Sequence, residues 1–125
     1  MRKQARSKKA YQDGVSREAM AAALLRMKFY RILGTRLKTP FGEVDILAEK
    51  NGALVIVEVK ARDSENAAAG AISAQQKERL LRAGEYLSAR FQNRAGQGWN
   101  TIRMDAFLFM PRRLPRHIKN AFGPR

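Results

Sequence analysis

An Asn51-Gly52 dipeptide lies between two apolar runs and constrains the fold more than any other feature of this sequence. Asn-Gly is the strongest short-range signal for a β-hairpin, because both residues tolerate the positive φ angles of a type I′ turn. With these two residues as the loop, Lys50 pairs with Ala53, and that pair fixes the register of both strands. We therefore predict an antiparallel hairpin with strands over residues 43–48 and 53–61.

Four charged side chains are predicted to share one face of this hairpin. The register places Asp45 opposite Glu58 and Glu43 opposite Lys60. Counted outward from the turn, Asp45 and Glu58 form a non-hydrogen-bonded pair, in which Cα atoms lie about 4.5 Å apart. Strict alternation puts these four residues on one face and the apolar neighbours on the other, namely Val44, Ile46, Val57 and Val59.

Opposed carboxylates destabilise a sheet unless something compensates them. Acids are also scarce here, with 11 Asp and Glu against 25 Lys and Arg. Because carboxylate oxygens suit Mg²⁺ or Mn²⁺, we take Asp45, Glu58 and Glu43 as candidate metal ligands. Lys60 would then stabilise a transition-state phosphate or position a water molecule. The structural alternative is an ordinary sheet surface on which Lys60 pairs with Glu43 or Glu58.

Two helices are predicted from apolar residues at helical spacing. The first is expected to begin at Asp13 as its N-cap and to run to about Lys28. Its predicted buried stripe consists of Met20, Leu24 and Met27.

The second helix is expected to open at Ser73 and to run to about Phe91. Its predicted buried face carries Leu80, Leu87 and Phe91. Ser73-x-x-Gln76 has the pattern of a capping box, and we favour that role for Gln76 over a catalytic one.

Strands over residues 29–37 and 101–110 complete the predicted order of helix, three strands, helix, strand. A short turn of helix is expected over 117–122. Within the last strand, Asp105 is expected to be a structural acid paired with a core Arg such as Arg103. Tyr30 and Trp99 are expected to pack at strand edges, with stacking on unpaired bases as the alternative.

The charge of the chain points to a polyanionic partner. The 125 residues carry a formal net charge of +14 and are 45% hydrophobic, which is enough for one core. We expect nucleic acid, and DNA in particular, to be the partner, although an anionic membrane surface would attract the same charge. Residues 1–12 contain five Lys and Arg and no acid, so we interpret them as a flexible basic arm before a single domain over 13–125.

Composition also excludes several classes. Cys is absent and His117 is the sole histidine, which excludes disulfide scaffolds, thiolate zinc sites and sites built on paired histidines. No apolar run approaches the ~20 residues of a membrane span. We therefore expect a cytoplasmic protein that is not inserted in a membrane.

An acid, a short spacer bearing a turn, and Glu-x-Lys at the end of an apolar strand together resemble the PD-(D/E)xK, or restriction-endonuclease-like, nucleases. More closely, the chain resembles the YraN family of bacterial proteins over roughly residues 14–122. The residues that carry this resemblance are Glu18, Glu43 with Asp45, Glu58 with Lys60 and Arg62, and Arg103-Met104-Asp105. It implies an α/β fold with an αβββαβ core, in which a mixed sheet containing the antiparallel hairpin is flanked by helices, as in archaeal Holliday-junction resolvases.

The resemblance also implies that Glu18 approaches the metal, whereas an acid in the first turns of a helix is favoured by the helix dipole alone. The chain departs from the family pattern at Arg17, Arg36, Lys38 and Gln76. Arg36, Lys38 and Arg62 flank the acids, and we interpret them as contacts to a phosphate backbone or as ordinary solvated charges.

We therefore expect a DNA endonuclease that uses Mg²⁺ or Mn²⁺ and recognises DNA by shape, for example at branches. Its catalytic residues would be Asp45, Glu58, Lys60, Glu43 and Glu18. The alternative is a nucleic-acid-binding protein that keeps the nuclease fold without catalysis. A homodimer is one arrangement that would treat both strands of a duplex.

Overall fold

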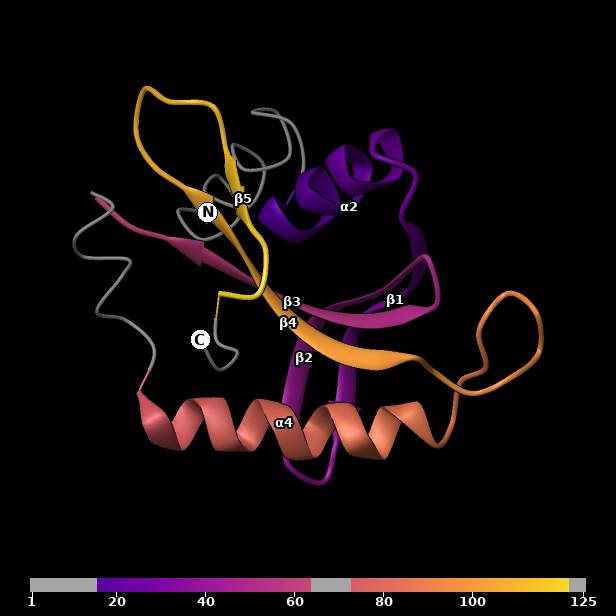
Figure 1. Ribbon diagram of the computed structural model, residues 1–125. Coiled ribbons are helices and arrows are strands. Elements are labelled where there is room, and N and C mark those ends of the chain that lie inside the picture. Colours follow the sequence, from indigo (N-terminus) through magenta and orange to yellow (C-terminus); the bar gives the residue numbers. More distant parts are fainter. Residues whose placement is uncertain (1–15, 64–72, 122–125) are drawn as a thin grey trace, which may run out of the picture.

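A five-stranded mixed sheet separates two helices in the computed structural model, which describes residues 16–63 and 73–121 (Figure 1). The elements are α2 (Arg17–Met27), β1 (Arg31–Thr39), β2 (Gly42–Lys50), β3 (Ala53–Ala61), α4 (Ala74–Ser88), β4 (Thr101–Phe109) and β5 (Arg116–Ile118). The strand order is β1-β2-β3-β4-β5, with only β3 and β4 parallel among these neighbours. This confirms the predicted α/β class and αβββαβ order. The predicted arm over residues 1–12 lies outside the described residues.

The central hairpin has the predicted turn and register. Asn51 and Gly52 have φ angles of 53° and 83°, the two positive values that a type I′ turn requires. Pairing begins at Lys50–Ala53 and continues to Ile46–Val57. The Asn-Gly signal therefore set the position of both strands correctly.

The core has two layers, one on each face of the sheet. Below the sheet in Figure 1, Leu80 of α4 packs with Leu54 and Ile56. Above it, Leu25 of α2 packs with Val55 and Val57. Strand β3 is buried on both faces, which explains why its sequence is apolar at every position up to Glu58. Within the described residues, neither helix is long and apolar enough to cross a membrane.

The first helix differs from its prediction in its start and its buried face. It begins at Arg17, with Ser16 as the N-cap whose hydroxyl accepts a hydrogen bond from the Ala19 amide at 3.2 Å. Asp13 lies outside the described residues. The fully buried positions are Ala21, Ala22 and Leu25, whereas Met27 of the predicted stripe is 74% exposed. The buried face of α2 therefore consists of two alanines and Leu25, and it does not include Met27.

The predicted helical turn at the C-terminal end is wrong, since Arg116–Ile118 form strand β5 against β4. Asp105 explains this difference. Its carboxylate is within 2.8 Å of His117 Nε2 and accepts a hydrogen bond from the Asn120 amide at 2.8 Å. Two contacts to one buried acid hold the segment alongside β4, which local sequence pattern does not reveal.

Candidate metal centre on the central hairpin

The β2–β3 ladder opens at the position of the predicted carboxylate pair. Its last backbone pair is Ile46–Val57. Beyond it, the Val59 amide donates a hydrogen bond to Asp45 Oδ2 at 2.8 Å. The Asp45 carboxylate thus takes the place of a backbone carbonyl and lies between the two strands.

Strict alternation along β2, as predicted, is wrong at this point. Val44 packs in the core layer between the sheet and α4, whereas Ile46 packs in the layer between the sheet and α2. In β1, the residue opposite Asp45 is Arg36, which has a φ of 52°, and the regular pairs on either side are Thr35–Ile46 and Leu37–Val44. At this point Arg36 has a left-handed backbone on one side of β2, and the ladder to β3 is open on the other side. Between Val44 and Ile46, β2 therefore departs from strict alternation.

Glu58 is the most unusual acid of the site. The residue is 4% exposed, and no described residue hydrogen-bonds to its buried Oε2 atom. Its other oxygen, Oε1, lies 3.9 Å from Arg79 Nη2. Burial, followed by repulsion from Asp45, raises the pKa of Glu58 to about 7 against the opposing effects of Lys60, Arg79 and a hydrogen bond from the Asp45 backbone. The fold therefore places a carboxylate where its charge is poorly compensated.

Asp45 shares this electrostatic environment. Burial is the main reason that its pKa is raised, and Glu18 and Glu43 add repulsion. The hydrogen bond from the Val59 amide and the charge of Lys60 oppose that rise. Glu18 from α2 and Lys60 from β3 therefore both lie near enough to act on Asp45.

Glu43 is placed differently from the other two predicted ligands. It is exposed near the start of β2. Among the described residues, no three His, Asp or Glu side chains converge as a metal-binding group. The site consequently has a closely coupled pair, Asp45 and Glu58, with Glu43 and Glu18 at its periphery.

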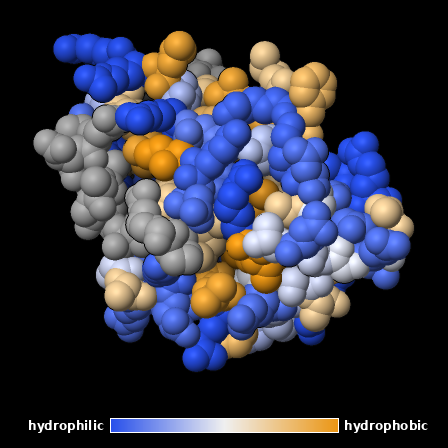
Figure 2. Space-filling model, viewed as in Figure 1, coloured by the Kyte–Doolittle hydropathy of each residue, from blue (hydrophilic) through white to orange (hydrophobic). Residues whose placement is uncertain are grey.

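The predicted backbone-binding cations lie on β1 and at the end of β3. Arg36 Nη2 lies 3.5 Å from Glu18 Oε1, which links β1 to α2 beside Asp45. Lys38 is exposed and faces Glu43 across the β1–β2 ladder. Arg62 follows the end of β3, where its Nη1 donates to the Ala61 carbonyl at 2.7 Å. More generally, hydrophilic side chains cover most of the face in Figure 2, with hydrophobic ones in separate small groups.

Sequence reasoning missed Arg79. Besides its ion pair with Glu58, its Nη1 donates to the carbonyl oxygens of Phe41 and Glu43 at 3.1 and 3.4 Å. Arg79 therefore connects α4 to the beginning of β2 and to the buried acid. Nothing in the local pattern of α4 marks it among its basic neighbours, because its role depends on how the helix crosses the sheet.

The remaining candidates have structural contacts. Ser73 Oγ accepts a hydrogen bond from the Gln76 amide at 3.1 Å, as the predicted cap requires. Asp105 is fully buried and is bonded by Arg103 through Nε and Nη2, both at 2.9 Å. The Tyr30 hydroxyl accepts from Arg103 Nη2 at 2.8 Å, and Trp99 Nε1 donates to the Phe91 carbonyl at 3.0 Å.

These features define an α/β protein with two coupled carboxylates at the open end of a central antiparallel hairpin. The sequence model described as "Uncharacterised protein family UPF0102" matches residues 17–109. The UPF0102 protein of Caulobacter sp. strain K31 is 47% identical over 120 residues, covering 96% of this chain and 84% of the relative. That of Parvibaculum lavamentivorans is 44% identical over 115 residues, covering 92% and 84%. The chain belongs to the UPF0102 family, which confirms the predicted resemblance to YraN proteins.

Proposed function

We propose that this protein is a metal-dependent endonuclease that hydrolyses phosphodiester bonds in DNA. The observation that carries the proposal is the Glu58 Oε2 atom, which is buried, has no hydrogen-bond partner among the described residues and repels Asp45. A buried carboxylate oxygen without a partner costs stability. A bound cation would compensate it.

The donor atoms fit Mg²⁺ or Mn²⁺, since hard divalent ions prefer carboxylate oxygens. Asp45 and Glu58 would hold the ion, and Glu43, whose charge acts on Asp45, would be a further ligand. Such an ion, when bound, lowers the pKa of a coordinated water and withdraws charge from a phosphate.

The other residues of the site would handle the DNA. Lys60 lies near both carboxylates and would stabilise charge on the scissile phosphate. Arg36, Lys38 and Arg62 would hold the neighbouring backbone. Glu18 would keep Arg36 in place through their ion pair.

The net charge of +14 supports a nucleic acid as the substrate. Among the residues that the structure describes, no element is suited to reading base edges in a groove, so recognition by the shape of branched DNA is the form we propose. A homodimer would supply one site for each strand of a duplex. Such an enzyme would act in the cytoplasm, where bacterial DNA is found.

The test is a cleavage panel of linear, nicked, flapped and four-way DNA with Mg²⁺ or Mn²⁺. We expect the wild type to cut at least one branched substrate and chelation by EDTA to stop it. Asp45→Asn and Glu58→Gln should each slow cleavage by about a hundredfold or more. Glu85→Gln on the exposed face of α4 removes the same charge and should cut at the wild-type rate.

Equal cleavage by Asp45→Asn and the wild type would contradict the proposed site. The alternative function is non-catalytic binding of nucleic acid, and the Arg79–Glu58 ion pair favours it by partly compensating the acid without a metal. In that case no substrate would be cut with either ion. DNA binding would persist, with log affinity falling by about 0.9 per phosphate contacted for each decade of salt.

A further inference from the structure

Phe29 has a backbone conformation that its residue type disfavours. It follows Lys28, the C-cap of α2, and has a φ of 69°. The Phe29 amide donates to the Arg26 carbonyl at 2.9 Å and the Tyr30 amide to the Leu25 carbonyl at 3.0 Å. These two bonds form a Schellman motif, in which the left-handed position is usually Gly. A residue with a bulky side chain is disfavoured there by contacts of its Cβ atom.

Core packing does not account for the choice of Phe either. Phe29 is 85% exposed, so little apolar surface is buried by its ring. The ammonium group of Lys50 lies 5.7 Å from the Phe29 ring centroid and 5.2 Å from that of Tyr30, and it donates a hydrogen bond to the Lys28 carbonyl at 2.6 Å. The fold thus presents an aromatic ring and a cation together at the surface, at a conformational cost.

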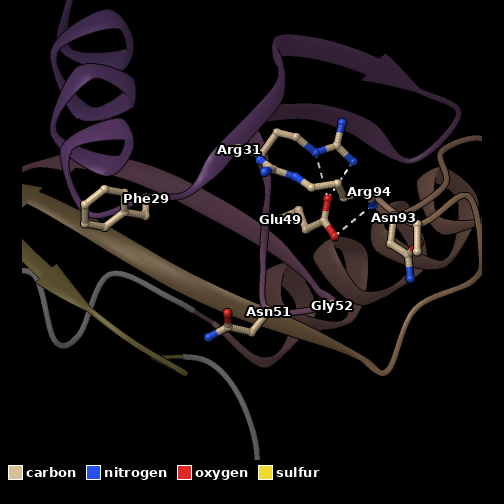
Figure 3. Close-up of a pocket in the computed structure, with 8 residues that line it drawn as sticks. Phe29, Arg31, Glu49, Asn51, Gly52, Asn93 and Arg94 are labelled. Atoms are coloured by element: carbon tan, nitrogen blue, oxygen red, sulfur yellow. Dashed lines mark hydrogen bonds and ion pairs between the residues drawn. The ribbon is translucent and has the colours of Figure 1, made fainter.

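Phe29 also forms one wall of a pocket of about 370 Å³ beside the hairpin turn. This Phe29 pocket is lined by Phe29, Arg31, Glu49, Asn51, Gly52, Asn93, Arg94 and Ala95 (Figure 3). Its volume lies within the range of small-ligand sites. The pocket therefore offers an aromatic surface and polar side chains within one recess.

The charges of the pocket favour an anion. Its one acid, Glu49, is already satisfied, because Arg31 Nε donates to Oε1 at 2.8 Å and the Arg94 amide donates to Oε2 at 3.0 Å. Two guanidinium groups line the pocket, and the Lys50 ammonium group lies close to the Phe29 ring. The net local charge is positive beside an exposed ring.

We propose that the Phe29 pocket binds an unpaired nucleotide of single-stranded DNA. The base stacks on the Phe29 ring, the side-chain amide of Asn51 faces its polar edge, and Arg94 and Lys50 bind the adjoining phosphates. This assignment rests on the proposed function, because it specifies which part of the DNA substrate the protein holds.

The pocket lies at the opposite end of the hairpin from the two carboxylates. Asn51 is six residues beyond Asp45, and an extended strand rises about 3.4 Å per residue, so the two regions lie on the order of 20 Å apart. A single strand held in the pocket could therefore extend from a duplex junction placed near Asp45 and Glu58. Branched and flapped DNA have this combination of paired and unpaired segments.

The test measures binding in EDTA, without cleavage, by fluorescence anisotropy of labelled oligothymidine and of a duplex of equal length. Phe29→Gly should weaken oligothymidine binding about tenfold or more and change duplex binding by no more than about twofold. Its urea midpoint should equal or exceed that of the wild type, since Gly suits the left-handed position. Phe29→Tyr keeps the ring and should bind like the wild type. Leu114→Ala removes another exposed apolar side chain, 88% exposed, and should change neither affinity.

Unchanged oligothymidine binding by Phe29→Gly would overturn the assignment, as would an equal loss on both DNA forms. Arg94→Gln should weaken oligothymidine binding and make its salt slope shallower by about one phosphate contact.

Failure of this binding test can be distinguished from failure of the cleavage panel. A protein that cuts no DNA but shows the predicted Phe29 effect keeps this site and loses the endonuclease proposal. A protein that cuts branched DNA but shows no Phe29 effect keeps the endonuclease proposal and loses this site.

Discussion

At the scale of single residues, Glu58 links the function of the hairpin to a loss of stability. Its pKa of about 7 lies above the ordinary 4.5 chiefly because the carboxyl group is buried. A carboxyl group with a higher pKa in the folded state than in the unfolded state binds protons more strongly when folded. The folded state therefore loses stability as pH rises from about 4.5 to about 7, and the loss persists above that range.

We predict that Glu58→Gln is more stable than the wild type at pH 8 in EDTA, because it replaces a buried charge with a neutral amide. The gain in unfolding free energy should be on the order of 1–3 kcal/mol and should become much smaller at pH 5. Urea unfolding at the two pH values measures it. Glu85→Gln, which alters an exposed acid, should show no such pH-dependent difference. A Glu58→Gln variant less stable than the wild type at pH 8 would contradict this interpretation of Glu58.

The closeness of Asp45 and Glu58 could be predicted because a two-residue turn sets the register of both strands up to the last pair, Ile46–Val57, which precedes these acids. The packing of Val44 in the other core layer could not be predicted, since it departs from strict alternation where the ladder has opened. The contact of Arg79 with Glu58 could not be predicted from the sequence either, because it joins residues of separate elements. Local patterns thus located the acids, while the groups that perturb them came from tertiary structure.

At the scale of elements, the approach of α4 to the sheet holds Arg79 near Glu58. Gly84 makes this approach close, because a Cβ atom there would overlap Ile56 Cδ1 and lie 3.2 Å from Ile102 Cγ2. Ile56 is fully buried and has little room to move. A glycine in a helix interior, usually unfavourable, is explained here by packing.

We predict that Gly84→Ala lowers the unfolding free energy by about 1–3 kcal/mol despite the better helix propensity of Ala, because the added methyl group overpacks this interface. Chemical denaturation measures the change. Ile56→Val removes the overlapping Cδ1 atom, so the double variant should recover part of the loss. Stability that rises in Gly84→Ala alone would show that the helix can shift, contrary to this account.

The types and order of the principal elements could be predicted from periodicity. Which side of each helix faces the sheet could be predicted less well. Alanines are poor markers of a core, yet Ala21 and Ala22 form the buried face of α2 together with Leu25. Strand β5 depends on His117 and Asn120 binding Asp105, contacts that sequence spacing does not indicate.

At the scale of the whole molecule, the net charge of +14 favours a polyanionic partner. The carboxylates lie at one end of the central hairpin, and the Phe29 pocket lies at its turn. We propose that the same hairpin therefore positions both the cleavage chemistry and the unpaired strand. A surface of this charge would attract DNA from any direction, so specificity must come from these two places.

The central claim is that Asp45 and Glu58 form one divalent-cation site. Titration of the protein with Mn²⁺, followed by the electron paramagnetic resonance signal of free Mn²⁺, tests it without DNA. We predict saturable binding by the wild type and by Glu85→Gln, with affinity reduced about tenfold to a hundredfold in Asp45→Asn and in Glu58→Gln. Equal Mn²⁺ binding by all four proteins, or no binding by the wild type, would contradict the claim.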